Sequence, residues 1–420
     1  MLVVTILIFG LLAFLNYRVA RKAIFAPAVV FSVVWMVALI VTWLSGNLFY
    51  PITVETLAIF SCGAAAFSIG SALAFLYPQS KPRPQDNFPR WSNRLLTLLF
   101  LLALCGVPFA VWWIVNAVSG SAANFFLAAS SVLVDETNQA PGQYSLFGDI
   151  IVLGSAVAVI AFFEREHGKK RAVIAILMAL ALNLLTASRS AVFGFLFALL
   201  CLDWLKNRRI RWRFLAVVGT ALLIAATAIA IYLGKGDARP GASVTENAVP
   251  VLQGFALYES GPLVAFDRVV RNPNIVNHNW HIDRFFLQVL NKLGGHFVVP
   301  GINADYVAVG PHGLMQNVYT FYFAYLDFGY FGMMPLVCAI GFTITLFYKR
   351  AIEGGKIASL FYSMLIGGVI FSTFNESLFF GLNTLWKTIA VGLLIYSAPP
   401  AWARFNGFVK HRVASSLANS

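Results

Sequence analysis

Charged residues are scarce in this chain. Only 11% of its 420 residues are Asp, Glu, Lys or Arg, where a soluble domain carries about 25%. Hydrophobic residues make up 59%, and the mean hydropathy is +0.77. This composition excludes a water-soluble protein, and the continuous apolar runs lack the period-two alternation of a transmembrane β-barrel. The sequence therefore predicts an all-α polytopic membrane protein, because each span requires about 20 apolar residues.

Cysteine is also rare, and no CxxC spacing occurs. The four cysteines (Cys62, Cys105, Cys201 and Cys338) all lie inside apolar runs, where cysteine acts as a small apolar side chain. This pattern predicts neither a disulfide framework nor a metal site. The net charge of +13 does not predict a nucleic-acid partner, because excess Lys and Arg in a membrane protein normally lies in cytoplasmic loops.

Eleven apolar runs divide the chain, at about residues 2–17, 26–45, 54–77, 95–117, 148–164, 172–188, 191–206, 214–233, 329–348, 357–373 and 383–398. The first run has no basic segment before it and no small-residue cleavage site, so it is expected to be a retained span. Four parts follow: spans 1 to 8 in 1–233, a large polar loop at 234–316, spans 9 to 11 in 317–398, and a basic tail at 399–420.

The distribution of Lys and Arg predicts the orientation of these spans. With the N-terminus outside, 22 of the 30 basic residues fall in inner loops or the tail. The other eight lie outside: Arg189, Lys235, Arg239, Arg268, Arg271, Arg284, Lys292 and Lys387. This is the positive-inside pattern. It predicts a periplasmic N-terminus, a cytoplasmic C-terminus and a large periplasmic loop at 234–316.

Arg189 lies in TASRSAVFG, between two apolar runs that are joined by almost nothing. A charge within the membrane is costly and is a functional candidate for that reason. A planar guanidinium at the membrane surface suits a phosphate or diphosphate. The alternative is a snorkelling arginine at a tight turn, although such residues are expected mainly on the inner side.

Arg268 and Arg271 lie in YESGPLVAFDRVVRNP, three residues apart, so they would share one face of a helix. Together with Arg189 they could clamp a diphosphate. The alternative is a solvated helix in which Glu259 and Asp267 neutralise both arginines. Two further loop arginines carry the same two interpretations: Arg239 and Arg284.

The histidines of the large loop are candidates for a metal site or for a general base. His278 and His281 are three apart in HNWH, but no HExxH pattern follows, so no metal is predicted. His312 precedes a span and lies close to Asn317. A histidine there could act as general base on a sugar hydroxyl, or it could be a loop residue that is bonded to the backbone.

Acidic and aromatic residues are concentrated at the outer ends of the last spans. Asp327 and Glu376 could each orient a catalytic histidine or serve as the base. The aromatic residues, Tyr258 and Tyr319 among them, suit either an interfacial belt or stacking against sugars. The sequence does not separate these two roles.

The order of these motifs resembles a known family. A short outer turn carries SRSA, the large loop contains YESGPLVAF, and an Asn-x-Tyr sequence followed by DFGYFG opens the next span. The chain is in this respect similar to the Wzy-type oligosaccharide repeat-unit polymerases, which make O-antigen. It more distantly resembles the O-antigen ligases, which share the GT-C-like architecture. The likeness covers most of the chain in layout and about forty residues as motif.

The resemblance implies an inverting glycosyltransferase in the bacterial inner membrane. Its substrates would be undecaprenyl-diphosphate-linked oligosaccharides, with the lipid diphosphate as leaving group. It would need no nucleotide sugar, metal or other cofactor, and a chain-length regulator is an implied partner alongside membrane lipids. Arg189 matches the arginine that contacts the diphosphate in the ligases, and Asn317, Tyr319 and Tyr258 fall in the motifs and become candidates for substrate binding.

One departure from the ligases bears on the base. The ligases open the corresponding span with His-Asn, whereas this chain has Gln316-Asn317. Glutamine cannot act as a base, which favours a polymerase over a ligase and leaves the base to be found among His312, Asp327 and Glu376.

A flippase for the same lipids is the alternative from another class. It would be expected to have charged residues along a central cavity and internally repeated halves. The middles of the apolar runs are almost free of charge and no repeat is visible, which favours chemistry at one leaflet.

Overall fold

The computed structural model describes residues 1–78, 88–117, 143–185, 189–208, 213, 216–217, 219–220, 244–275, 284–298, 306–311, 313–318, 321–373 and 382–397. The main helices of these segments are α1 (Leu2–Val19), α2 (Pro27–Leu44), α3 (Val54–Leu76), α4 (Arg90–Ala117), α6 (Gln143–Phe163), α7 (Lys169–Leu185), α8 (Arg189–Asn207), α10 (Val244–Arg271), α11 (Arg284–Lys292), α12 (Ala324–Ile352), α13 (Lys356–Ile370) and α15 (Leu382–Ser397). Short 3₁₀ helices are η1 (Gly46–Leu48), η3 (Arg165–His167), η5 (Pro273–Ile275), η6 (Phe321–Phe323) and η7 (Phe371–Thr373). One two-stranded hairpin joins β1 (Tyr306–Ala308) to β2 (Met315–Asn317).

The protein is a helical membrane protein. Within the described residues, seven helices are long and apolar enough to cross a bilayer: α1, α2, α3, α4, α6, the segment Phe321–Ile352 that contains α12, and the segment Lys356–Thr373 that contains α13. Large apolar side chains on these helices face outward, as Leu7 and Leu76 do, because lipid is their solvent. The predicted total of eleven spans stays a prediction, since most of the run at 214–233 lies outside the described residues.

Local sequence accounts for several helix boundaries. Pro27 opens α2, at a position where its fixed φ suits a first turn. Thr53 caps α3, with its hydroxyl accepting a bond from the Thr56 amide at 3.4 Å. Gly329 interrupts α12 near its start with φ 61° and ψ −165°, a conformation that costs little only in glycine. The DFGYFG motif therefore marks a kink just inside a longer helix.

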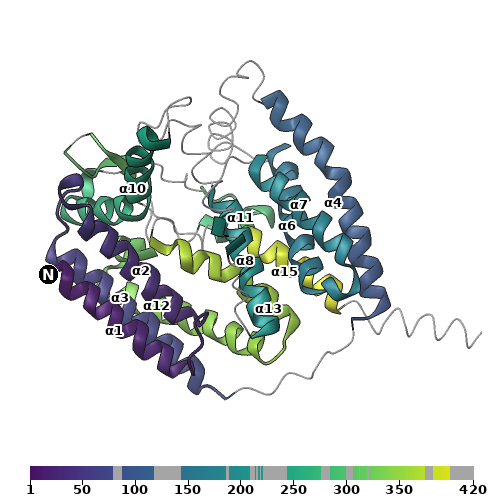
Figure 1. Ribbon diagram of the computed structural model, residues 1–420, viewed down its shortest axis with the longest axis horizontal. Helices are drawn as coiled ribbons and strands as arrows, with labels where there is room; N and C mark the ends of the chain where they lie inside the picture. The colour runs from purple at the N-terminus through teal and green to yellow at the C-terminus, as the bar shows by residue number, and fades with distance from the viewer. Residues whose placement is uncertain are drawn as a thin grey trace, which may run out of the picture.

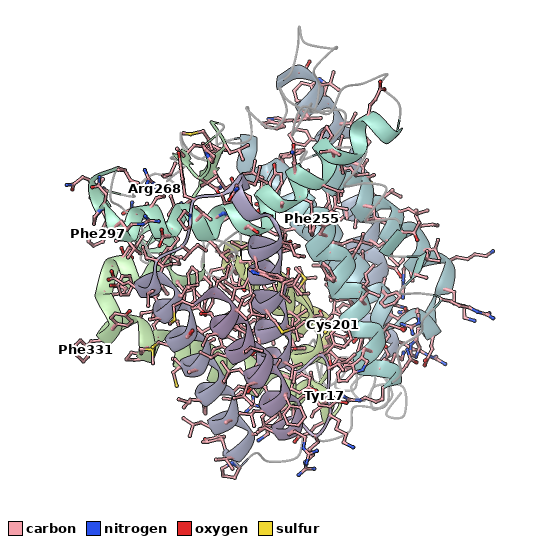
Figure 2. The ribbon with its side chains drawn as sticks, turned by 60° about the vertical axis from the view of Figure 1, so that its left-hand side comes forward. Tyr17, Cys201, Phe255, Arg268, Phe297 and Phe331 are labelled. Atoms are coloured by element: carbon pink, nitrogen blue, oxygen red, sulfur yellow. The ribbon has the colours of Figure 1, made fainter. Side chains whose placement is uncertain are left out.

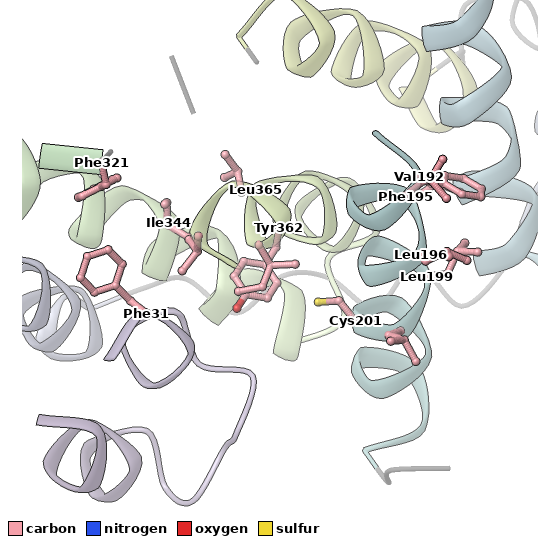
Figure 3. Close-up of a cluster of buried hydrophobic side chains, with 14 of the residues drawn as sticks. Phe31, Val192, Phe195, Leu196, Leu199, Cys201, Phe321, Ile344, Tyr362 and Leu365 are labelled. Carbon is pink, nitrogen blue, oxygen red and sulfur yellow. The ribbon is translucent and has the colours of Figure 1, made fainter. Parts of the chain in front are cut away.

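The helices form two groups with a bridge between them (Figure 1). Helices α1, α2, α3 and α12 pack together on one side, and α4, α6 and α7 on the other. Helix α13 contacts α2, α8, α12 and α15 and is the most buried of the candidate spans. Figure 3 shows this junction as a continuous apolar cluster, in which Tyr362 and Leu365 of α13 lie between Phe31 of α2 and Leu199 of α8.

Basic side chains fasten the helices at one end of the bundle, here called the basic end and defined by Lys206, Lys349 and Lys356. Lys349 donates to three carbonyl oxygens at the C-terminal end of α3, at 2.8 to 3.1 Å, which satisfies acceptors that a helix end leaves open. Lys356 pairs with the buried Glu164 at 3.0 Å, and Lys206 with Glu166 at 3.0 Å. These contacts bring together loops that the sequence predicts to lie on the cytoplasmic side.

The opposite end of the bundle, here called the α10 end, holds most of what is described of the predicted large loop. The segment predicted as a loop contains regular secondary structure: the 28-residue helix α10, the helix α11 and the β1–β2 hairpin. Figure 2 shows Arg268 and Phe255 of α10 toward one end of the molecule and Tyr17 of α1 toward the other.

The close packing of α3 against α12 can be tested by a glycine substitution. A Cβ built at Gly70 would overlap the carbonyl oxygen of Cys338, so the Gly70→Ala variant must move the two helices apart. We expect it to be destabilised by about 1–3 kcal/mol, the usual cost of overpacking, and to melt at a lower temperature in detergent. Gly10→Ala is the matched control, because its Cβ would make only an ordinary contact with Met36 at 3.5 Å. Equal melting temperatures for the two variants would contradict the packing.

Candidate functional site

Helix α10 positions the candidate site. Its N-terminal half is largely exposed and its C-terminal half, from Ser260 to Val269, is almost fully buried. The last turn carries Arg268 and Arg271, where cations complement the helix dipole. Both predicted arginines therefore come from one rigid element that is packed against the ends of the spans.

Asp267 ties α10 to the start of α3. Its carboxylate is fully buried and accepts hydrogen bonds from the Thr53 amide at 2.7 Å and the Thr53 hydroxyl at 2.5 Å. It also accepts from Arg271, whose Nε lies 2.7 Å away and whose guanidinium forms an ion pair with it. Arg271 donates in addition to the Pro51 carbonyl at 2.8 Å. A buried charge requires such partners, and here it obtains them from both elements.

Arg268 is held differently from Arg271, although only three residues separate them. Its guanidinium lies over the Tyr50 ring, 5.1 Å from the centroid, and its Nε is buried without a hydrogen-bond partner. Arg268 forms no ion pair with any side chain of the described segments. The predicted clamp thus contains one arginine that a carboxylate neutralises and one whose charge no described carboxylate balances.

The hairpin closes this end of the molecule. β1 and β2 are antiparallel, with Tyr306 opposite Asn317 and Val307 opposite Gln316. The Tyr50 amide donates to the Val309 carbonyl just beyond β1, at 2.9 Å. The hairpin therefore holds the segment that carries the ring beneath Arg268.

Gln316 has a structural role between the hairpin and α10. It is buried, and its amide nitrogen donates to the Leu257 carbonyl of α10 at 3.1 Å. Its side-chain oxygen accepts from the Asn317 amide at 3.0 Å. Both ends of the side chain are thereby engaged, so Gln316 braces the hairpin against α10. Asn317 and Tyr258 are half-buried on these two elements.

Glu259 is a half-buried carboxyl of α10, and it does not neutralise the two arginines as the alternative interpretation of the sequence had it. It lies nine and twelve residues from the two arginines, or about 14 and 18 Å along the helix. It instead accepts a long hydrogen bond from the Thr373 hydroxyl at 3.5 Å. Burial raises the pKa of Glu259, and the bond from Thr373 lowers it by less. The signal in the sequence was an acidic residue in a mostly apolar stretch of α10, two residues before Gly261-Pro262.

The remaining predicted residues are placed only in part. Asp327 lies in the first turn of α12 and is exposed. Arg189 begins α8 and Arg284 begins α11, and the side chains of both are outside the described structure. Four further candidates lie wholly outside the described residues: Arg239, His312, Tyr319 and Glu376. Among the residues that are described, no group of three His, Cys, Asp or Glu side chains could hold a metal.

No family model, curated protein or solved structure matches the chain.

The Asp267–Arg271 pair can be tested by a double-mutant cycle. We expect Asp267→Asn and Arg271→Met each to lower the free energy of unfolding by about 1–3 kcal/mol, because each leaves the other side chain without a hydrogen-bond partner. The double variant should lose less than the sum of the two, giving a coupling energy that differs from zero in detergent unfolding curves. Strictly additive losses would mean that the two side chains do not interact.

Glu259 predicts a pH dependence of stability. Because its pKa is raised in the folded protein, the folded state holds the proton more tightly than the unfolded chain does. Stability is therefore lost as the pH rises from the ordinary carboxyl value of 4.5 through the raised pKa. Glu259→Gln removes this titration, so its melting temperature should exceed that of wild type at neutral pH and converge with it near that ordinary value.

The matched control for this measurement is Glu353→Gln, which changes an exposed carboxyl after α12. Its melting curve should follow wild type across the same pH range. A constant difference between Glu259→Gln and wild type at every pH would contradict the assignment.

Proposed function

We propose that this protein is an oligosaccharide repeat-unit polymerase of the Wzy type. It is an inverting glycosyltransferase that joins undecaprenyl-diphosphate-linked repeat units for lipopolysaccharide or another surface polysaccharide. The observation that carries the proposal is Arg268, a cation without a carboxylate partner among the described residues, stacked on Tyr50 at the α10 end. A polyanionic leaving group is the ligand that such a site suits best.

The proposed reaction uses two lipid-linked chains. A hydroxyl of one repeat unit attacks the anomeric carbon of the other, and the bond from that carbon to the diphosphate oxygen breaks with inversion. The hydroxyl proton passes to a base, and the departing lipid diphosphate carries the new negative charge. Stabilising this charge is the arginines' part, and holding two large substrates in register supplies much of the remaining rate.

Arg268 and Arg189 are the proposed diphosphate ligands, with Arg239 and Arg284 as further candidates. Arg271 supports the site through Asp267, since its charge is already balanced. The proposed substrate-binding residues are Tyr258, Asn317 and Tyr319, and the base is one of His312, Asp327 and Glu376.

The hydrogen bond of Gln316 favours a polymerase over an O-antigen ligase. The side-chain amide of Gln316 donates to the Leu257 carbonyl of α10, at the position where a ligase would present its histidine. A GT-C-like arrangement with the α10 end in the periplasm and the basic end in the cytoplasm agrees with the basic loops. The membrane would be the bacterial inner membrane, and a chain-length regulator a partner.

A polymer ladder tests the proposal. Purified protein in nanodiscs would receive lipid-diphosphate-linked repeat units with no other enzyme, and the products would be resolved on a gel. We expect wild type to form a ladder, and Arg268→Ala and Arg189→Ala to reduce its rate by about 10²-fold or more, as loss of a donor to a developing oxyanion does. Arg268→Lys should recover part of the rate if charge is sufficient.

Arg350→Ala is the matched control, because it removes an exposed arginine from the basic end. It should form the same ladder as wild type. If wild type forms no ladder but moves the lipid between leaflets, the chain is a flippase and the proposal is wrong. If all arginine variants polymerise normally, the enzyme class stands and the diphosphate site does not.

A further inference from the structure

Helix α11 turns its apolar face away from the protein. The outward residues lie on one helix face: Val289, Leu290 and Leu293, with Leu293 just past the helix end. Leu287, Gln288 and Asn291 are the less exposed side chains. A helix on the surface of a water-soluble domain would bury its apolar stripe against the core. This arrangement is the reverse, and it requires an apolar environment outside the protein.

The turn after α11 extends the same surface. Asn291 accepts a hydrogen bond from the Phe297 amide and donates one to the Phe297 carbonyl, both at 2.7 Å. These two hydrogen bonds to one residue fix the turn. Phe297 and Val298 project outward from it, and Val298 is 90% exposed. The exposed apolar residues are thus held in place by specific polar contacts.

The surface continues onto the lipid-facing side of the bundle. Phe331, in the outer part of α12, is 97% exposed, and Phe328 one turn earlier is also exposed. Figure 2 shows Phe297 and Phe331 projecting from the same edge of the molecule, with Phe297 nearer the end that carries Arg268. Because α12 lies within a candidate membrane span, the lipid boundary at this edge leads toward α11.

We propose that α11 and its following turn insert into the lipid leaflet at the α10 end. The inserted set, here called the apolar rim, is Val289, Leu290, Leu293, Phe297 and Val298. An amphipathic helix in a membrane interface lies in the plane of the bilayer with its apolar face about 5–10 Å deep. The cations that open and end α11, Arg284 and Lys292, are the residue types that attract lipid phosphates. The inference does not depend on the proposed enzymatic activity.

A fluorophore at Val298 tests the insertion. The full chain, with its four cysteines changed to alanine and Val298→Cys labelled with the environment-sensitive dye NBD, would be placed in phosphatidylcholine–phosphatidylglycerol nanodiscs. We expect blue-shifted emission that lipids with a doxyl group near the headgroup quench. Asn274→Cys is the matched control: Asn274 is an exposed polar residue of η5, and its dye should report water and escape quenching.

Each other result overturns the proposal. Unshifted emission at Val298 would mean that the rim faces water, and shifted emission without quenching would mean that protein covers it, whether a second copy or another chain. If the cysteine-free protein does not fold, wild type in nanodiscs with photoactivatable phosphatidylcholine gives the same decision. Peptides covering 284–298 should be cross-linked to lipid, and their absence from the cross-linked set would contradict the insertion.

Discussion

The buried carboxylate of Asp267 is the interaction on which the α10 end depends. It has no exposure to solvent, and its partners come from the amide and hydroxyl of Thr53 and from Arg271. Because a buried charge without partners is costly, α10 can dock on the spans only in the register that brings these groups together. The same contacts join the capping residue of α3 to the last turn of α10.

Because of this constraint, Arg268 and Arg271 have different partners, although their positions in the sequence make them appear equivalent. Arg271 forms an ion pair with Asp267, whereas Arg268 lies over the Tyr50 ring and has no ion-pair partner among the described residues. The hairpin supports the ring side of this arrangement through the Tyr50 amide and supports α10 through Gln316. If Arg268 binds the substrate diphosphate as proposed, a site that is built on a helix and braced in this way would be positioned before the substrate arrives, which would lower the reorganisation needed in the reaction.

The sequence predicted those features that depend on local pattern. Continuous apolar runs predicted a helical membrane protein, which the seven candidate spans among the described residues bear out. The three-residue spacing predicted that Arg268 and Arg271 would lie together on a helix, and both lie on α10. The full length of α10 was not predictable, because Pro250 and Pro262 within it normally interrupt a helix. The choice of Arg271 as partner of Asp267 depends on Thr53, 214 residues away along the chain, and no local pattern carries that information.

The central claim is that Arg268 binds a polyprenyl diphosphate, and equilibrium binding tests it most directly. Farnesyl diphosphate, a short and soluble probe, would be titrated calorimetrically into the full chain in nanodiscs as wild type, Arg268→Met and Arg350→Met. The account predicts that Arg268→Met weakens binding by about tenfold or more, because a hydrogen bond to a charged group contributes about 1.5–3 kcal/mol, and that Arg350→Met matches wild type. Equal affinities for wild type and a folded Arg268→Met would contradict it.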